Sequence, residues 1–75
     1  MAEDFSFNIE KSLGILSTQK SGWNLELNYI SWGNREPKYD IRSWDPKHEK
    51  MGKGITLKKE ELIALRDLLN TLDLN

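Results

Sequence analysis

The sequence predicts an α+β fold in which a four-stranded antiparallel sheet is followed by one C-terminal helix. Apolar and polar residues alternate over residues 5–9 and 23–32, with the period of two that is typical of a half-buried strand. Two further extended runs follow at about 38–45 and 53–57. The period then becomes helical from Lys59 to Leu72. One helix can cover only one face of a sheet, so the other face must meet water, a ligand or a second subunit.

The first extended region, residues 5–18, contains an irregularity. Its apolar residues change parity between Ile15 and Leu16, beside Gly14. A glycine at a parity change is typical of a bulge or a sharp bend. We therefore expect either one long bent strand or two short ones, followed by a hairpin turn at residues 19–22.

The strand at 23–32 predicts how the two faces of the sheet differ. Its odd positions are apolar: Trp23, Leu25, Leu27 and Tyr29. Its even positions are mostly polar, so we expect the odd face to pack against a core and the even face to be mostly open. Ile30 and Trp32 interrupt the polar face near its end, and large apolar groups on such a face indicate a partner subunit or a ligand.

The last two strands and the helix continue this pattern. Tyr39 and Ile41 share one face of the third strand, and Ile55 and Leu57 are expected to point inward from the fourth. The helix carries a stripe of leucines at helical spacing: Leu62, Leu65, Leu69 and Leu72. We expect this stripe to pack on the sheet and, because it is wide, also to contact a second subunit.

A chain of 75 residues is enough for one small domain, spanning 1–75, in which residues 1–4 are expected to be disordered. Such a domain has a thin core, and without cysteine no disulfide or thiolate metal site can reinforce it. Association with a second copy would bury more apolar surface, so we expect a homodimer. No apolar run approaches the ~20 residues of a membrane helix, and the acidic N-terminus lacks a hydrophobic signal core. We expect a soluble cytoplasmic protein with no membrane partner.

The residues give little support for catalysis. The single histidine, His48, is interpreted as a solvated loop residue, and one histidine without cysteine cannot form a zinc site. The run Gly52-Lys53-Gly54 lacks the wider pattern of a phosphate-binding loop. We therefore predict no enzyme activity, no catalytic residues, no metal and no cofactor.

The charge is unevenly distributed along the chain. Residues 35–59 hold eight basic and four acidic residues, a balance of +4, whereas the remainder has a balance of −5. Local charge sets the field at a binding face, so a net charge of −1 does not exclude nucleic acid. Ordinary clustering on a solvated surface would give the same distribution.

Aromatic and basic residues are predicted to share one sheet face. Trp32, Arg42 and Trp44 should lie together there, with Lys38 and Asn28 nearby. Proteins that bind single strands combine cations for phosphates with flat rings for bases, and each stacked base contributes about 1–3 kcal/mol. The alternative is that the two tryptophans form a cross-strand pair or a dimer interface, and composition alone leaves both open.

Two stretches carry a resemblance to a known family. They are Tyr39-Asp40-Ile41-Arg42-Ser43-Trp44-Asp45-Pro46 and Gly52-Lys53-Gly54-Ile55-Thr56-Leu57. With the helix that follows, they resemble the C-terminal single-stranded-DNA-binding domain of the transcriptional coactivator positive cofactor four, and most closely its small bacterial members of the type called YdbC. The resemblance is specific over residues 38–69 and extends, in pattern only, over 5–33.

This resemblance implies a β-β-β-β-α homodimer whose helices pair on one side and whose curved sheets bind single-stranded DNA with little sequence preference. By position, Arg42 looks like the arginine that contacts the phosphate backbone, and Trp32 and Trp44 look like the stacking aromatics. The motif here has one residue fewer between Arg42 and the tryptophan, so Trp44 can fill either of two aromatic slots. The serine-rich acidic tail of the eukaryotic coactivator is absent, which leaves the DNA-binding module. Basic positions at strand edges and in the first turn are matched by Lys38, Lys53 and, more loosely, Lys20.

We therefore predict a homodimer that binds single-stranded DNA without sequence specificity and acts in the regulation of transcription, in replication or in repair. The binding residues are expected to be Lys20, Asn28, Trp32, Lys38, Arg42, Trp44 and Lys53. The same rings and cations would suit an RNA-binding module, because nothing in the sequence distinguishes the 2′-hydroxyl. Exposed tryptophans would also suit a protein-interaction domain.

Overall fold

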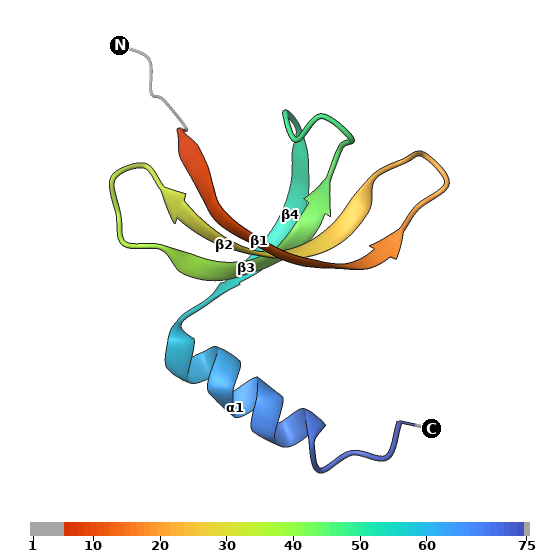
Figure 1. Cartoon of the computed structure of the whole chain (residues 1–75), viewed down its shortest axis with the longest axis vertical. Helices are drawn as coiled ribbons and strands as arrows, with labels where there is room; N and C mark the ends of the chain where they lie inside the picture. Colours follow the sequence, from red (N-terminus) through yellow and green to blue (C-terminus); the bar gives the residue numbers. More distant parts are fainter. Residues whose placement is uncertain (1–5, 75) are drawn as a thin grey trace.

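A computed structural model describes residues 6–74, which form a four-stranded sheet and one helix (Figure 1). The elements are β1 (Phe7–Thr18), β2 (Asn24–Trp32), β3 (Lys38–Trp44), β4 (Met51–Leu57) and α1 (Lys59–Leu69). The strands lie in the order β1-β2-β3-β4, and each neighbouring pair is antiparallel. This confirms the predicted α+β class. The expectation for residues 1–4 lies outside the described residues, within which no helix is long and apolar enough to span a membrane.

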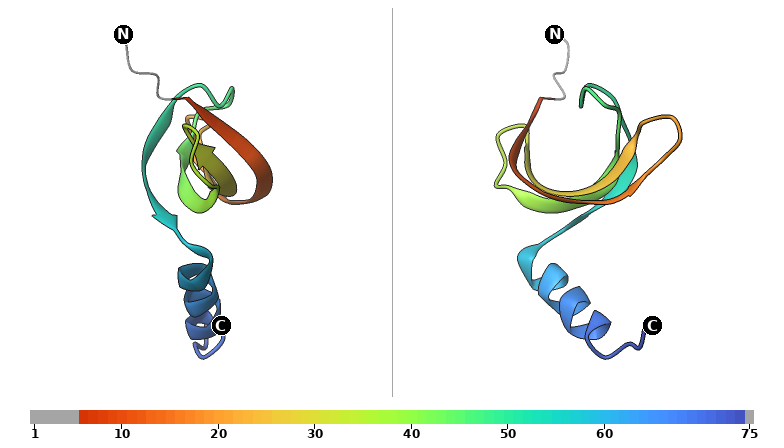
Figure 2. Two further views of the ribbon diagram at one scale, coloured as in Figure 1. Left: turned by 90° about the vertical axis from the view of Figure 1, so that its left-hand side faces the viewer. Right: turned by 45° about the vertical axis from the view of Figure 1, so that its right-hand side comes forward.

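The sheet is strongly bent, so that it forms a trough with the helix below its outer side (Figure 2). We call the inner side the concave face and the outer side, which α1 approaches, the convex face. The bend runs along the strands themselves. Phe7 lies opposite Trp32 at one end of β2, and Trp44 lies opposite Asn24 at the other end. A straight strand would separate those ends by about 26 Å, yet the rings of Phe7 and Trp44 are 5.2 Å apart.

Irregular pairing of β1 accompanies this bend. The register between β1 and β2 shifts three times, because Glu10, Leu13 and Leu16 are each inserted between regularly paired residues. Each extra residue bends the strand and increases its twist. Of the two alternatives for residues 5–18, the structure therefore has one long bent strand, and its middle irregularity ends at Gly14, beside which the parity change was noted.

The prediction of which face is more buried was wrong. The even positions of β2 and β3 line the concave face, where Ile30, Trp44 and Asp40 are fully buried and Asn28 is 1% exposed. The apolar residues at odd positions of β2, Leu25, Leu27 and Tyr29, are only half-buried. The reason is geometric: bending brings the concave side chains together across the trough, whereas the convex face meets only one helix.

Helix α1 begins after Lys58, whose backbone N–H donates to Glu61 Oε1 at 2.8 Å. Acidic residues in the first turn complement the helix dipole. The helix ends at Leu69, earlier than the predicted Leu72, and the hydroxyl of Thr71 donates to the carbonyl oxygen of Leu68 at 2.7 Å. No residue of the helix is buried.

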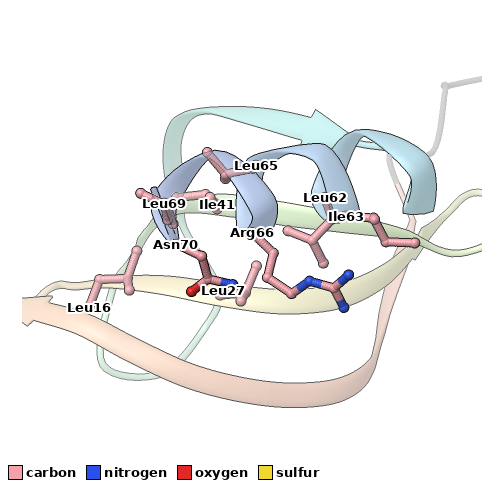
Figure 3. A pocket seen from close by; sticks show the side chains of 9 residues that line it. All are labelled: Leu16, Leu27, Ile41, Leu62, Ile63, Leu65, Arg66, Leu69 and Asn70. Carbon is pink, nitrogen blue, oxygen red and sulfur yellow. The ribbon is translucent and has the colours of Figure 1, made fainter. Parts of the chain in front are cut away.

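The leucine stripe covers its own sheet only in part. Leu62 and Leu65 face a hollow of about 520 Å³ that also has Leu27 and Ile41 of the convex face in its lining (Figure 3). Towards the end of the helix, Leu69, which also lines the hollow, remains 45% exposed. The convex side therefore presents an apolar surface that one subunit does not cover.

Candidate nucleic-acid interface

The concave face carries polar residues at its centre because β2 and β3 pair in register there. Glu26 lies opposite Arg42, and Asn28 lies opposite Asp40. Side chains of directly opposed residues in an antiparallel pair point to the same face. The four polar side chains therefore meet inside the trough, where water is largely excluded and each group needs a partner.

Arg42 finds its partner two residues away on its own strand. Its Nε donates to Asp40 Oδ1 at 2.7 Å and its Nη2 to Asp40 Oδ2 at 2.8 Å. Thr56 of β4 also donates to Asp40 Oδ2, at 3.0 Å. The carboxylate, which is fully buried, is thus neutralised by a bidentate ion pair and satisfied by a third donor. Such a pair is rigid, because both the distance and the plane of the guanidinium are set.

The same guanidinium lies over an indole ring. Arg42 Cζ is 4.8 Å from the centre of the Trp32 ring, a distance typical of a cation–π contact. Beside this pair is a hollow of about 550 Å³ lined by Trp32, Arg42, Met51 and Thr56. Arg42 thus forms both a wall of the hollow and a cover for the ring.

Gly54 allows β4 to approach Arg42 closely. A Cβ atom at position 54 would collide with Arg42 Cβ and with the carbonyl oxygen of Ile41. Gly54 lies directly opposite Arg42 in the ladder, and the register then shifts before Trp44 pairs with Met51. The glycine at the end of the Gly-Lys-Gly run thus has a packing function.

An aromatic cluster around Trp44 fills the trough where the two ends of the bent sheet come together. The ring of Trp44 lies 5.2 Å from that of Phe7 and 5.5 Å from that of His48. Phe7 also packs against Trp32, at 5.8 Å. Trp44 is 0% exposed, so the expectation that its ring lies open beside Trp32 is wrong. Bending of the strands carries Trp44 across the trough, where it becomes part of the core.

His48 lies in a loop with 40% of its side chain exposed, as interpreted from the sequence, but it also contacts Glu26. Its Nε2 lies 3.0 Å from each carboxylate oxygen of Glu26, and Asn28 Nδ2 donates to Glu26 Oε1 at 3.0 Å. His48 has a backbone φ of 58°, a conformation that asparagine and glycine adopt more readily than histidine. Because Glu26 is 22 residues away in sequence, only the way the trough closes brings the two together.

The loop that contains His48 is held together by Asp45. Its Oδ1 accepts hydrogen bonds from the backbone N–H groups of Glu49 at 2.7 Å and Lys50 at 2.9 Å. The Lys50 N–H contributes most to lowering the pKa of Asp45 below its ordinary value. A carboxylate in this position holds the turn that delivers His48 to Glu26.

The three lysines predicted to bind lie apart from one another on the surface. Lys20 is in the β1–β2 turn, Lys38 starts β3 and Lys53 is in the irregular part of β4, and all three are exposed. Trp32 and Arg42 do come together on the concave face, and Asn28 is buried on the same face, where it donates to Glu26. The structure thus gathers a polar and aromatic centre with cations nearer its periphery.

The sequence itself places this arrangement in a family. Residues 19–68, which include β2 to β4 and most of α1, match the family described as transcriptional coactivator p15 (PC4). The chain belongs to the PC4 family. Its domains are known for binding single-stranded DNA and for transcriptional coactivation. The matched range includes most of the concave centre and omits β1.

A relative in Treponema pallidum (strain Nichols) is 52% identical over 73 residues, which cover 97% of this chain and 86% of that protein. It is described only as an uncharacterized protein. The PC4 family membership therefore rests on the matched domain.

Proposed function

We propose that this protein is a homodimer that binds single-stranded DNA without sequence specificity at the concave face of each sheet. The observation that carries the proposal is the Arg42–Trp32 pair beside an open hollow, on the side of the sheet that faces away from the helix. A flat cation on an indole suits the faces of nucleobases, which are exposed in single strands and hidden in a duplex.

Phosphates are bound in this proposal by lysines at the periphery. Lys38 and Lys53 are exposed on β3 and β4, the strands that form one side of the hollow, and Lys20 is exposed on the first turn. Neutralising about four phosphates would make log K fall against log salt with a slope of roughly −3. The activity requires no catalysis and no cofactor, and it would operate in the cytoplasm, in transcription, replication or repair.

The second subunit belongs on the convex face. The apolar hollow beside Leu65 and the exposed leucines after it form a surface that is unusual for a monomer. A second helix placed there would cover this surface while leaving both concave faces free for DNA. Dimerisation and DNA binding would therefore use different residues.

The test is a titration of fluorescent oligo-dT, followed by anisotropy, with sedimentation to count subunits. Saturable binding that weakens with salt, on a protein sedimenting as a dimer, is the expected result. Binding without salt dependence would instead favour a protein-interaction domain. An RNA-binding module is the second candidate, and competition between matched DNA and RNA oligomers decides between the two.

A further inference from the structure

One of the two edges with which the Arg42 guanidinium could bind a phosphate is already occupied by protein. The bidentate pair with Asp40 occupies Nε and one N–H of Nη2. The remaining contacts, from Nη1 to Met51 Sδ and to the carbonyl oxygen of Gly52, are both 3.5 Å long. The Nε–Nη2 edge of the guanidinium is therefore turned towards Asp40, while Arg42 also lies over Trp32 and lines the hollow.

The charged groups around Arg42 also disfavour the binding of a phosphate there. Asp40 cancels the charge of the guanidinium, and Glu26 lies directly opposite Arg42 on β2 with its side chain 5% exposed. His48 is the other titratable group facing Glu26, at 3.0 Å. A phosphate drawn to Arg42 would approach two buried carboxylates.

Moving Arg42 towards a phosphate would also destabilise the folded protein. Asp40 is fully buried, and without Arg42 its one remaining side-chain hydrogen-bond donor among residues 6–74 is the Thr56 hydroxyl. A buried carboxylate that loses its cation is strongly unfavourable. The guanidinium is thus held in place over Trp32, with 16% of its side chain exposed.

We propose that Arg42 binds a nucleobase by stacking rather than a phosphate by charge, and that Asp40 is the positioning residue that holds the guanidinium on Trp32. The inference rests on the proposed function and assigns the base-binding part of that site. Guanidinium planes stack on bases much as aromatic rings do, and here the indole beneath supports the plane. The bases would enter the hollow lined by Arg42, Met51 and Thr56.

The experiment measures affinity for two fluorescent probes of about 15 nucleotides, across salt concentrations, with the full chain. One probe is oligo-dT, and the other has abasic sites in place of every base, so it offers phosphates without bases. Arg42→Gln removes both plane and charge, whereas Arg42→Lys keeps the charge. Lys38→Gln, at an exposed position on the same strand, is the matched control for a phosphate contact.

Both Arg42 variants are expected to lose about 5- to 140-fold in affinity for oligo-dT, the range of one stacked base. Their salt slopes should equal that of the unaltered protein, and their affinities for the abasic probe should not change. Lys38→Gln should weaken binding to both probes and reduce the slope by about 0.7. Restoration of affinity by Arg42→Lys, or a slope reduced by about 0.7 in Arg42→Gln, would overturn the inference.

Asp40→Asn tests the positioning role. The variant leaves Arg42 charged but without its ion pair, so affinity for oligo-dT should fall while affinity for the abasic probe stays the same or rises. Equal losses on both probes would indicate a purely structural role and refute the assignment of Asp40. Should this variant or Arg42→Gln fail to fold, as judged by circular dichroism, Arg42→Lys, which keeps a cation beside Asp40, still decides. If the unaltered protein does not bind oligo-dT at all, the proposed function itself fails, which is a distinct outcome.

Discussion

Replacing Trp44 with alanine should damage the fold rather than remove a stacking ring. The side chain is fully buried and lies within 5.5 Å, centre to centre, of both Phe7 and His48. Burying about 200 Å² of aromatic surface at about 25 cal/mol per Å² stabilises by about 5 kcal/mol. Alanine retains a small part of this, so the expected loss is about 3–5 kcal/mol. That is a large fraction of the stability of an ordinary domain, about 5–15 kcal/mol.

The assay is urea denaturation followed by circular dichroism, at one fixed protomer concentration because dimer stability depends on concentration. Trp32→Ala is the matched control, since Trp32 is only half-buried and lines the open hollow. It should lose less stability than Trp44→Ala and more affinity for oligo-dT when both proteins are folded. If Trp44→Ala kept its full stability and lost binding alone, the ring would be open to ligand in solution, and the account of the aromatic cluster would be refuted.

Three further outcomes follow from the geometry. Because the pKa of Asp45 is lowered in the folded protein, its contribution to stability is present above the unfolded value of 3.8 and is lost as pH falls through the folded value. The melting temperature of Asp45→Asn should therefore change less with pH in acidic solution than that of the unaltered protein, and an equal pH dependence would contradict this. Gly54→Ala should push β4 away from Arg42 and lower both the melting temperature and the affinity for DNA. Gly14→Ala is the control, because a Cβ at that position meets nothing within 4 Å, and it should leave the affinity unchanged. Leu69→Arg places a charge in the convex hollow and should yield monomers by sedimentation, and a dimer of unaltered stability would place the interface elsewhere.

The order of elements could be predicted because each has its own period. The strand at β2 alternates cleanly, the stripe from Leu62 onward is helical, and Gly14 indicated the irregularity in β1. Period two shows which residues share a face, but it does not show which face the sheet curves around. The burial of Glu26, Asn28 and Asp40 was therefore missed: polar residues read as solvent-facing, and only the closed trough reveals that Asn28 donates to Glu26 and that Arg42 pairs with Asp40.

Prediction of the site failed where distant strand ends meet. Trp32 and Arg42 could be paired from parity and register, and the structure brings them together. Trp44 has the same parity, yet the bend takes its ring to Phe7 at the far end of the sheet. His48 could not be assigned to Glu26, because the contact depends on a left-handed residue in a turn shaped by Asp45. Sequence spacing contains no signal for either contact.

The uneven pairing of β1 also bears on how such a small sheet stays in solution. Among the described elements β1 is an edge strand, paired on one side only. An unpaired edge can pair with a strand of another chain. Its ladder with β2 never runs for more than three residues before it is interrupted. An incoming chain would have to match the same interruptions to dock along it. The distortion that bends the sheet around its polar centre thereby also discourages fibre-like growth.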